Sequence, residues 1–256
     1  KSLSEKTVEA IRKAGELGIR FVPSTGRAFE AVPKNVSELP GVEYVITANG
    51  GAVYSAKEEK RIYQCLLTRE AVEAAIAVRK RENMVLEVVI DGVPYAEEAY
   101  VRDPMLYLAT EYGARYIKAT RKPVQDICRF AAEHAEELDN ISFVCSYEDK
   151  DRLYPVLDKE IPDIYVTSSV PNLMEIGHKD AGKGKTLLWL LQRLAISPDE
   201  AMAFGDADND ISMLTAVKYG MAMENGTENC RKAAAYVTDT NENDGVAKGI
   251  LRFFEV

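Results

Sequence analysis

The chain has 256 residues, 46% of them hydrophobic and 29% charged, which is the composition of an ordinary globular protein. This length allows one large domain or two smaller ones with a substantial core. Asp and Glu (41) outnumber Lys and Arg (32), and the net charge of −9 argues against non-specific binding to nucleic acid or to an anionic membrane.

The cysteines and histidines are scattered and argue against a zinc site. No CxxC pair occurs among the cysteines, and only two histidines are available. These residues are Cys65, Cys128, Cys145, Cys230, His134 and His178. Scattered cysteines are typical of small buried side chains in a reducing compartment, so we expect a cytoplasmic protein. No apolar stretch approaches the ~18 residues that indicate a membrane span.

The first 56 residues alternate between helix and strand patterns. The expected elements are, in chain order, a helix over 4–18, a strand over 19–24, the start of a helix over 25–32, and two strands joined by a turn over 43–55. Alternation of this kind favours a mostly parallel α/β sheet.

The segment 57–173 mixes hairpins with helices. The expected elements are a helix over 68–83, a hairpin over 84–98, helices near 103–113 and 124–138, a strand over 141–147, a helix over 150–160, and strands over 164–169 and 172–178. This mixture predicts an α+β module, an antiparallel sheet with helices on one face.

The remaining segment returns to a simple alternation. The expected elements are a helix over 185–196, a strand over 201–206, a helix over 210–217, a strand over 219–223, a helix over 227–234, a strand over 236–238 and a helix over 245–255. The sequence therefore predicts an α/β core formed by 1–56 and 174–256, with an inserted α+β module formed by 57–173.

The stretch "GDADND" directly follows the strand expected at 201–206. Asp206 and Asp210 are four residues apart across a tight turn, so both carboxylates can face one point at the carboxyl end of the strand, where open α/β sheets bind ligands. Oxygen ligands of this kind suit Mg²⁺. The alternative is that these acids cap the following helix. Capping accounts for one or two of them, and both interpretations stay open.

Two further segments carry candidate phosphate ligands. Thr25 and Gly26 lie between a strand and a helix and offer a hydroxyl and an unobstructed amide, although the pair alone is more typical of an ordinary turn. The stretch "GHKDAGKGKT" fails the P-loop pattern by one essential position in both registers. A lysine at the start of a helix is still a plausible phosphate ligand. We interpret Lys179 and Lys185 as solvated.

The order of these motifs resembles the haloacid dehalogenase-like phosphatases. "STGR" is followed by an inserted module, then by Lys183-Gly184, and then by "GDADND". The arrangement is most similar to the Cof-type subfamily, which carries a large inserted α/β cap, and the similarity extends to the "NGG" turn and to the closing "VTDTNENDGVAKGI". The resemblance implies a Rossmann-like parallel-sheet core with an inserted α+β cap.

The resemblance also implies roles for individual residues. Thr25 and the Gly26 amide would bind the transferring phosphoryl group, and Lys183 would neutralise it. Asp206 would ligate Mg²⁺ directly, Asp210 would support the metal through water, and Asn209 would orient the phosphoryl group. The implied activity is Mg²⁺-dependent hydrolysis of a small phosphorylated metabolite, such as a sugar phosphate, by a monomer or homodimer that binds neither nucleic acid nor membrane.

One family motif has no counterpart in this sequence. The family opens with a strand that ends in DxDGT, whose first Asp attacks phosphorus, and neither Asp206-Ala-Asp208 nor Asp149-Lys-Asp151 can replace it. We therefore expect the nucleophile, and the strand that carries it, upstream of Lys1. Two alternatives remain, namely a phosphomutase of the same superfamily and, if the chain truly starts at Lys1, an inactive protein that binds a phosphorylated ligand.

Overall fold

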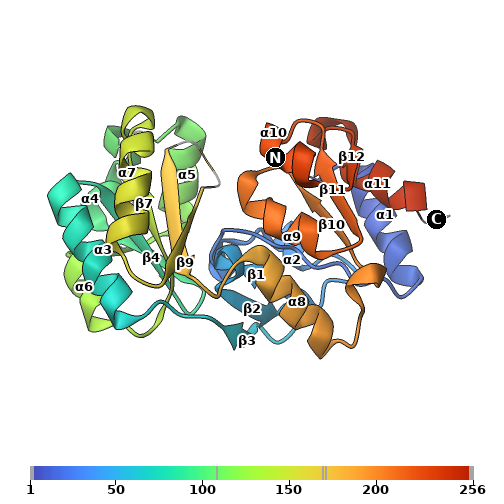
Figure 1. The fold of residues 1–256 in the computed structure, drawn as a ribbon, viewed down its shortest axis with the longest axis horizontal. Helices are drawn as coiled ribbons and strands as arrows, with labels where there is room; N and C mark the ends of the chain where they lie inside the picture. The colour runs from blue at the N-terminus through green and yellow to red at the C-terminus, as the bar shows by residue number, and fades with distance from the viewer. Residues whose placement is uncertain (1–2, 108, 169, 171, 254–256) are drawn as a thin grey trace.

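A computed structural model describes residues 3–107, 109–168, 170 and 172–253, and it shows two lobes (Figure 1). One lobe holds a six-stranded sheet with helices. The other holds two smaller sheets and is formed by both ends of the chain (Figure 1). None of the helices in the described part of the chain is long and apolar enough to cross a membrane.

The six-stranded lobe begins at the helix after Thr68, whose side chain caps it by accepting a hydrogen bond from the Ala71 amide. Its elements are α3 (Arg69–Glu82), β4 (Val85–Ile90), β5 (Val93–Glu97), α4 (Glu98–Arg102), α5 (Glu111–Thr120), β6 (Lys122–Val124), α6 (Ile127–Glu133), β7 (Leu138–Val144), α7 (Tyr147–Glu160), β8 (Ile164–Thr167) and β9 (Leu173–His178). The strand order is β6-β5-β4-β7-β9-β8, and all pairs are antiparallel except β5 with β6.

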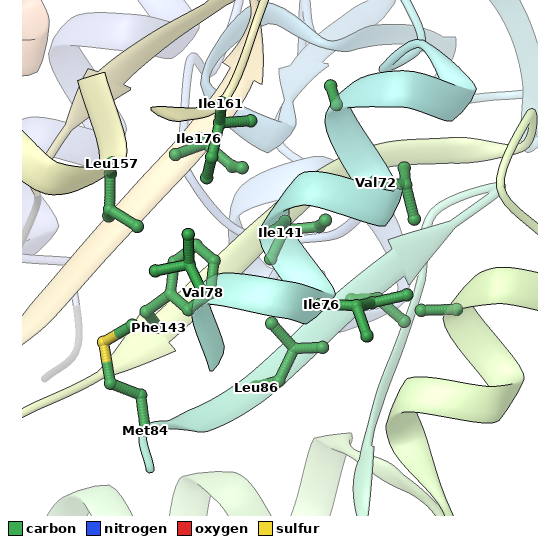
Figure 2. Packing of buried hydrophobic residues seen from close by; sticks show 14 of the residues in the cluster. Val72, Ile76, Val78, Met84, Leu86, Ile141, Phe143, Leu157, Ile161 and Ile176 are labelled. Carbon is green, nitrogen blue, oxygen red and sulfur yellow. The ribbon is translucent and has the colours of Figure 1, made fainter. Parts of the chain in front are cut away.

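Helices α3, α6 and α7 pack their apolar side chains against this sheet. Figure 2 shows Val72 and Ile76 of α3 gathered with Leu86 of β4 and Ile141 of β7 in one cluster of buried residues. The β4–β5 hairpin turns at Asp91-Gly92, where both residues have positive φ, as a tight two-residue turn requires. The expectation of an antiparallel sheet with helices on one face is wrong in two respects. Tyr100 of α4 and Ile117 of α5 pack with Val144 on the opposite face of the sheet, and β6 pairs in parallel with β5.

The second lobe contains α1 (Glu5–Glu16), α2 (Lys34–Ser37), β1 (Tyr44–Thr47), β2 (Ala52–Ser55), β3 (Lys60–Gln64), α8 (Lys183–Arg193), β10 (Met202–Gly205), α9 (Ile211–Ala216), β11 (Tyr219–Met223), α10 (Glu228–Ala233), β12 (Tyr236–Thr238) and α11 (Gly245–Phe253). Strands β1-β2-β3 form an antiparallel sheet, and β10-β11-β12 form a parallel one. The predicted α/β class, with a parallel sheet, is confirmed for β10–β12.

The expected strand over 19–24 forms only two isolated parallel bridges, Phe21 with Val42 and Ser24 with Ile46. A cavity of about 770 Å³ lies between this segment and β10 and is lined mostly by apolar side chains, Leu190 and Phe204 among them. Because the segment is bridged at one edge only and faces this cavity at the other, it does not form a regular strand, and the two small sheets do not join.

The strand pairing does not coincide with the expected boundaries of the inserted module. Strand β3 falls within 57–173 but pairs antiparallel with β2, so it extends the β1–β2 sheet. Strand β9 extends to His178 and pairs with β7 in the six-stranded sheet. The division of the chain into a core and an inserted cap stays a prediction. The six-stranded sheet spans residues 85–178.

Several local elements also differ from the expectation. The helix start expected at 25–32 is a short 3-10 turn over Phe29–Ala31, because the chain is extended at Ala28 and meets Pro33 shortly after. The helix expected near 103–113 is instead a short 3-10 turn over Pro104–Tyr107 followed by α5, which begins only at Glu111. The expected ranges 103–113, 164–169 and 245–255 include Leu108, Ser169, Phe254 and Glu255, which lie outside the described residues.

Candidate active site

The candidate site is a cavity of about 380 Å³ at the carboxyl end of β10. The chain leaves this strand at Gly205 and turns at once into the short helical turn Asp208–Asp210 before α9. The structure brings every residue that the sequence analysis selected to the lining of this one cavity, namely Thr25, Gly26, Lys183, Asp206, Asn209 and Asp210. The larger cavity beside it is lined mostly by apolar side chains, together with the charged residues Arg20, Asp199 and Glu200.

Asp210 holds the turn after β10 together. Its Oδ2 accepts hydrogen bonds from the amides of Asp206 (3.0 Å) and Ala207 (3.2 Å). A side chain on Gly205 would leave no room for this arrangement, since a Cβ there would lie 2.4 Å from the Cβ of Asp210. The helix-capping interpretation therefore accounts for Oδ2 of Asp210, while its Oδ1 binds Lys183.

Lys183, the first residue of α8, forms an ion pair with that other oxygen. Its Nζ lies 2.5 Å from Oδ1 of Asp210, and each side chain is only 7% exposed. Two buried opposite charges at this distance hold each other in place. The ammonium group is thus fixed at the wall of the cavity, and the Asp206 side chain remains exposed there.

Thr25 and Gly26 also line the cavity. The backbone of Thr25 is anchored by a hydrogen bond from its amide to the carbonyl oxygen of Ile46 (2.9 Å). Its hydroxyl oxygen accepts a hydrogen bond from the Arg27 amide (3.1 Å), which leaves the hydroxyl proton able to bond to an anion. A hydroxyl, an amide without a side chain and an ammonium group around one cavity suit a phosphoryl group.

Asp208 and Asp210 have different hydrogen-bond partners although they are close in sequence. Asp208 accepts hydrogen bonds from the Thr227 hydroxyl (2.5 Å) and the Asn229 side-chain amide (3.3 Å), and Thr227 in turn caps α10 by accepting from the Cys230 amide. The negative charge of this loop still reaches nearby groups. Burial first, and then the charges of the loop aspartates, raise the pKa of the Cys230 thiol to about 11.

The residues at the site fit a hard cation as a partial set of ligands. Within 3–107, 109–168, 170 and 172–253, no three His, Cys, Asp or Glu side chains gather closely enough to hold a metal ion. The donors that line the cavity are nevertheless oxygens, and Mg²⁺ is commonly bound by one or two carboxylates together with water and phosphate oxygens. Asp206 is an exposed carboxylate at the lining of the cavity, and the oxygens of Asp210 accept hydrogen bonds from Lys183 and from the backbone amides of Asp206 and Ala207.

The sequence analysis missed two residues that the structure joins to the site. Asn49, interpreted there only as part of a turn, accepts a hydrogen bond from the amide group of Asn209 at 3.0 Å. Glu175 on β9 accepts one from Asn49 at 3.0 Å. The available signal for Glu175 was an acidic residue inside the apolar stretch "LMEI". A charge that is buried there is costly unless other polar groups bind it, so the pattern indicates a polar partner.

The lysines set aside as solvated are exposed. Lys179 pairs with Asp163 at 2.7 Å, and Lys185 donates to the carbonyl oxygen of Lys179 at 2.8 Å. Neither lysine lines the cavity. Their interpretation as surface charges is confirmed.

Comparison with known proteins identifies the family. Residues 1–250 match the model of the haloacid dehalogenase-like hydrolases, and the chain belongs to this family. Phosphatase YwpJ of Bacillus subtilis is 27% identical, over 96% of this chain and 91% of that protein. The 5-amino-6-(5-phospho-D-ribitylamino)uracil phosphatase YcsE of the same organism is 24% identical, over 97% and 87%. A solved sugar phosphatase of subclass IIB in this superfamily shares the fold, with a TM-score of 0.83 at 24% identity over 98% and 92%.

Proposed function

We propose that this hydrolase removes phosphate from a small phosphorylated metabolite in a Mg²⁺-dependent reaction. The observation that carries the proposal is the convergence of Thr25, Lys183 and Asp206 on one cavity from three distant parts of the chain. Phosphoryl transfer needs positioning and neutralisation of charge above all. The cavity supplies a hydroxyl and an ammonium group for the phosphoryl oxygens and a carboxylate for a cation.

Each residue then has a distinct part. The Thr25 hydroxyl and the Gly26 amide bind the phosphoryl oxygens, and Lys183 offsets their negative charge while Asp210 keeps its ammonium group in place. Asp206 would hold the metal directly and Asp210 through water. Bound there, Mg²⁺ would supply positive charge to the phosphoryl group. Asn209 orients the same group from the side of the cavity that faces Asn49.

The mechanism that we propose passes through an aspartyl-phosphate. Asp210 is unsuited to be the nucleophile because Lys183 and two amides occupy its oxygens. Asp206 is assigned to the metal. The attacking carboxylate is therefore another aspartate.

Metabolites that carry a phosphorylated sugar or polyol chain are the substrates that we propose. The support is the relative YcsE, a phosphatase of 5-amino-6-(5-phospho-D-ribitylamino)uracil, which carries a phosphorylated ribityl chain. The volume of the cavity, about 380 Å³, is at the small end of the range for ligand sites and suits a phosphoryl group with its immediate neighbours.

The test is phosphate release from p-nitrophenyl phosphate and a panel of sugar phosphates, with Mg²⁺ or with EDTA. We expect turnover only with Mg²⁺, and a loss of roughly a hundredfold in Asp206→Asn. Asp208→Asn is the matched control, because Asp208 faces Thr227 and Asn229. Isomerised sugar phosphate without release would favour the phosphomutase, and binding without turnover would favour the inactive binding protein. Either result would overturn the proposal.

A further inference from the structure

Three polar side chains connect the six-stranded sheet to the phosphate cavity. Oε1 of Glu175 on β9 accepts a hydrogen bond from Nδ2 of Asn49, and Oδ1 of Asn49 accepts one from Nδ2 of Asn209, both at 3.0 Å. Glu175 is 4% exposed and Asn49 is 2% exposed, so their hydrogen bond is shielded from water. Asn209 is the member that lines the cavity.

The carboxylate of Glu175 fixes the direction of this chain. An ionised carboxylate only accepts hydrogen bonds, so Asn49 must turn its NH₂ group toward Glu175. The carbonyl oxygen of the Asn49 side chain then faces Asn209, which must present its own NH₂ group in return. Without an obligate acceptor at one end, both amides could flip together and keep the hydrogen bond between them. Glu175 therefore removes an ambiguity that the two amides cannot resolve alone.

We propose that Glu175 is a positioning residue that sets, through Asn49, the orientation of the Asn209 amide at the phosphate cavity. This orientation decides which face of the amide, donor or acceptor, is turned toward a bound phosphoryl group. The inference rests on the proposed function, in which Asn209 orients that group. Glu175 itself acts through Asn49 and does not line the cavity.

The same contacts couple the two lobes. Tyr165 on β8 donates its hydroxyl proton to the backbone carbonyl oxygen of Asn49 at 2.8 Å, so two neighbouring strands of the six-stranded sheet hold this residue. The loop that binds phosphate packs directly on the contact, since a Cβ on Gly26 would lie 3.0 Å from both the Asn49 amide and Glu175. Any movement of this sheet away from the second lobe breaks the hydrogen bonds that orient Asn49, and Asn209 loses its fixed partner.

A swap of functional groups tests the direction of the chain. In Asn49→Asp two carboxylates face each other, and we expect kcat to fall about tenfold or more while KM changes less. The double variant Asn49→Asp with Glu175→Gln restores one donor and one acceptor, and the carboxylate at position 49 can still accept from Asn209. We expect kcat to recover to within about threefold of the unmodified protein. Equal activities of the single and double variants, with both folded, would overturn the proposal.

A readout that needs no turnover keeps this test separate from that of the function. The side-chain amide resonances of Asn209, in protein labelled with ¹⁵N-asparagine, should shift in Asn49→Asp and return in the double variant. Glu87→Gln is the matched control, because Glu87 is a buried glutamate of the same sheet that pairs with Arg121 at 2.6 Å. It should lower thermal stability and leave the Asn209 resonances in place. Absence of turnover in the unmodified protein would contradict the proposed function. Asn209 resonances that are the same in Asn49→Asp and in the double variant would contradict the role of Glu175.

Discussion

Lys183 and Asp210 form a buried ion pair that belongs to both the fold and the candidate site. Nζ of Lys183 lies 2.5 Å from Oδ1 of Asp210, and the second oxygen of Asp210 holds the turn after β10. The pair therefore connects the start of α8 to the carboxyl end of β10. Removal of either partner leaves the other as an uncompensated buried charge.

Lys183→Met should consequently reduce stability as well as activity. We expect the free energy of unfolding, measured with urea, to fall by about 3 kcal/mol, since the Asp210 carboxylate loses its counter-charge. Lys248→Met is the control, because Lys248 forms an ion pair of the same length with Asp239 but is 55% exposed. Its effect should be far smaller, as solvent screens that pair. Equal losses in the two variants would show that the burial of the Lys183 pair has no energetic weight.

Gly26→Ala should impair the site through crowding. The added methyl group would meet the Asn49 amide and Glu175 at 3.0 Å, closer than these neighbours tolerate without moving. We expect kcat/KM to fall about tenfold, because a small displacement of positioned groups is costly in catalysis. The measurement is steady-state kinetics on the best substrate of the panel.

Gly15→Ala serves as the control for that substitution. Gly15 lies inside α1, and a Cβ there has only an ordinary contact of 3.9 Å with the carbonyl oxygen of Pro40. Alanine should stabilise the helix by about 0.5–1 kcal/mol and leave kcat/KM unchanged. A Gly26→Ala variant that is as active as Gly15→Ala would contradict the close packing of the phosphate loop on Asn49.

The local chemistry of the site could be predicted from sequence, and its long-range contacts could not. Asp206 and Asp210 follow a strand within one tight turn, so their meeting is a local matter. Thr25 and Lys183 are assigned to the same phosphoryl group only by the family resemblance. The hydrogen bond between Asn49 and Glu175 joins residues 126 positions apart, and no local pattern encodes such a pairing.

The segment 19–24 was expected to form a regular strand from its local sequence, and it does not. Its apolar composition is typical of a buried strand, and its backbone does pair with Val42 and Ile46. A regular strand also requires a continuous ladder of hydrogen bonds to a neighbour, and that ladder is set by tertiary structure. The segment is not buried either, since Arg20 is exposed and the other residues of 19–24 are half-buried along the larger cavity, so composition predicted neither its burial nor its hydrogen bonding.

Asp139 gives the protein a pH-dependent stability in the acidic range. Burial first, against the opposing hydrogen bond from the Gly92 amide and the charge of Arg61, raises the pKa of Asp139 from 3.8 to about 6. Between these values the folded state binds more protons than the unfolded state, so this group makes stability fall as pH rises. The contribution is complete near pH 4 and lost above about pH 6, roughly 3 kcal/mol in all.

Urea unfolding of the unmodified protein and of Asp139→Asn across pH 4 to 7 measures this contribution. The difference in unfolding free energy between the two proteins should move against the unmodified protein as pH rises, because asparagine does not titrate. A difference that stays constant with pH would contradict the raised pKa. A difference that moves in favour of the unmodified protein would mean that the ion pair with Arg61, at 3.0 Å, outweighs burial.

The central claim is that one cavity at the carboxyl end of β10 binds both phosphate and a divalent cation. A crystal structure of the protein grown with Mg²⁺ and inorganic phosphate tests it most directly. We expect a cation on the Asp206 carboxylate and a phosphate within hydrogen-bonding distance of the Thr25 hydroxyl, the Gly26 amide and Lys183. Phosphate bound elsewhere, or a cation on the protein without contact to Asp206, would contradict it.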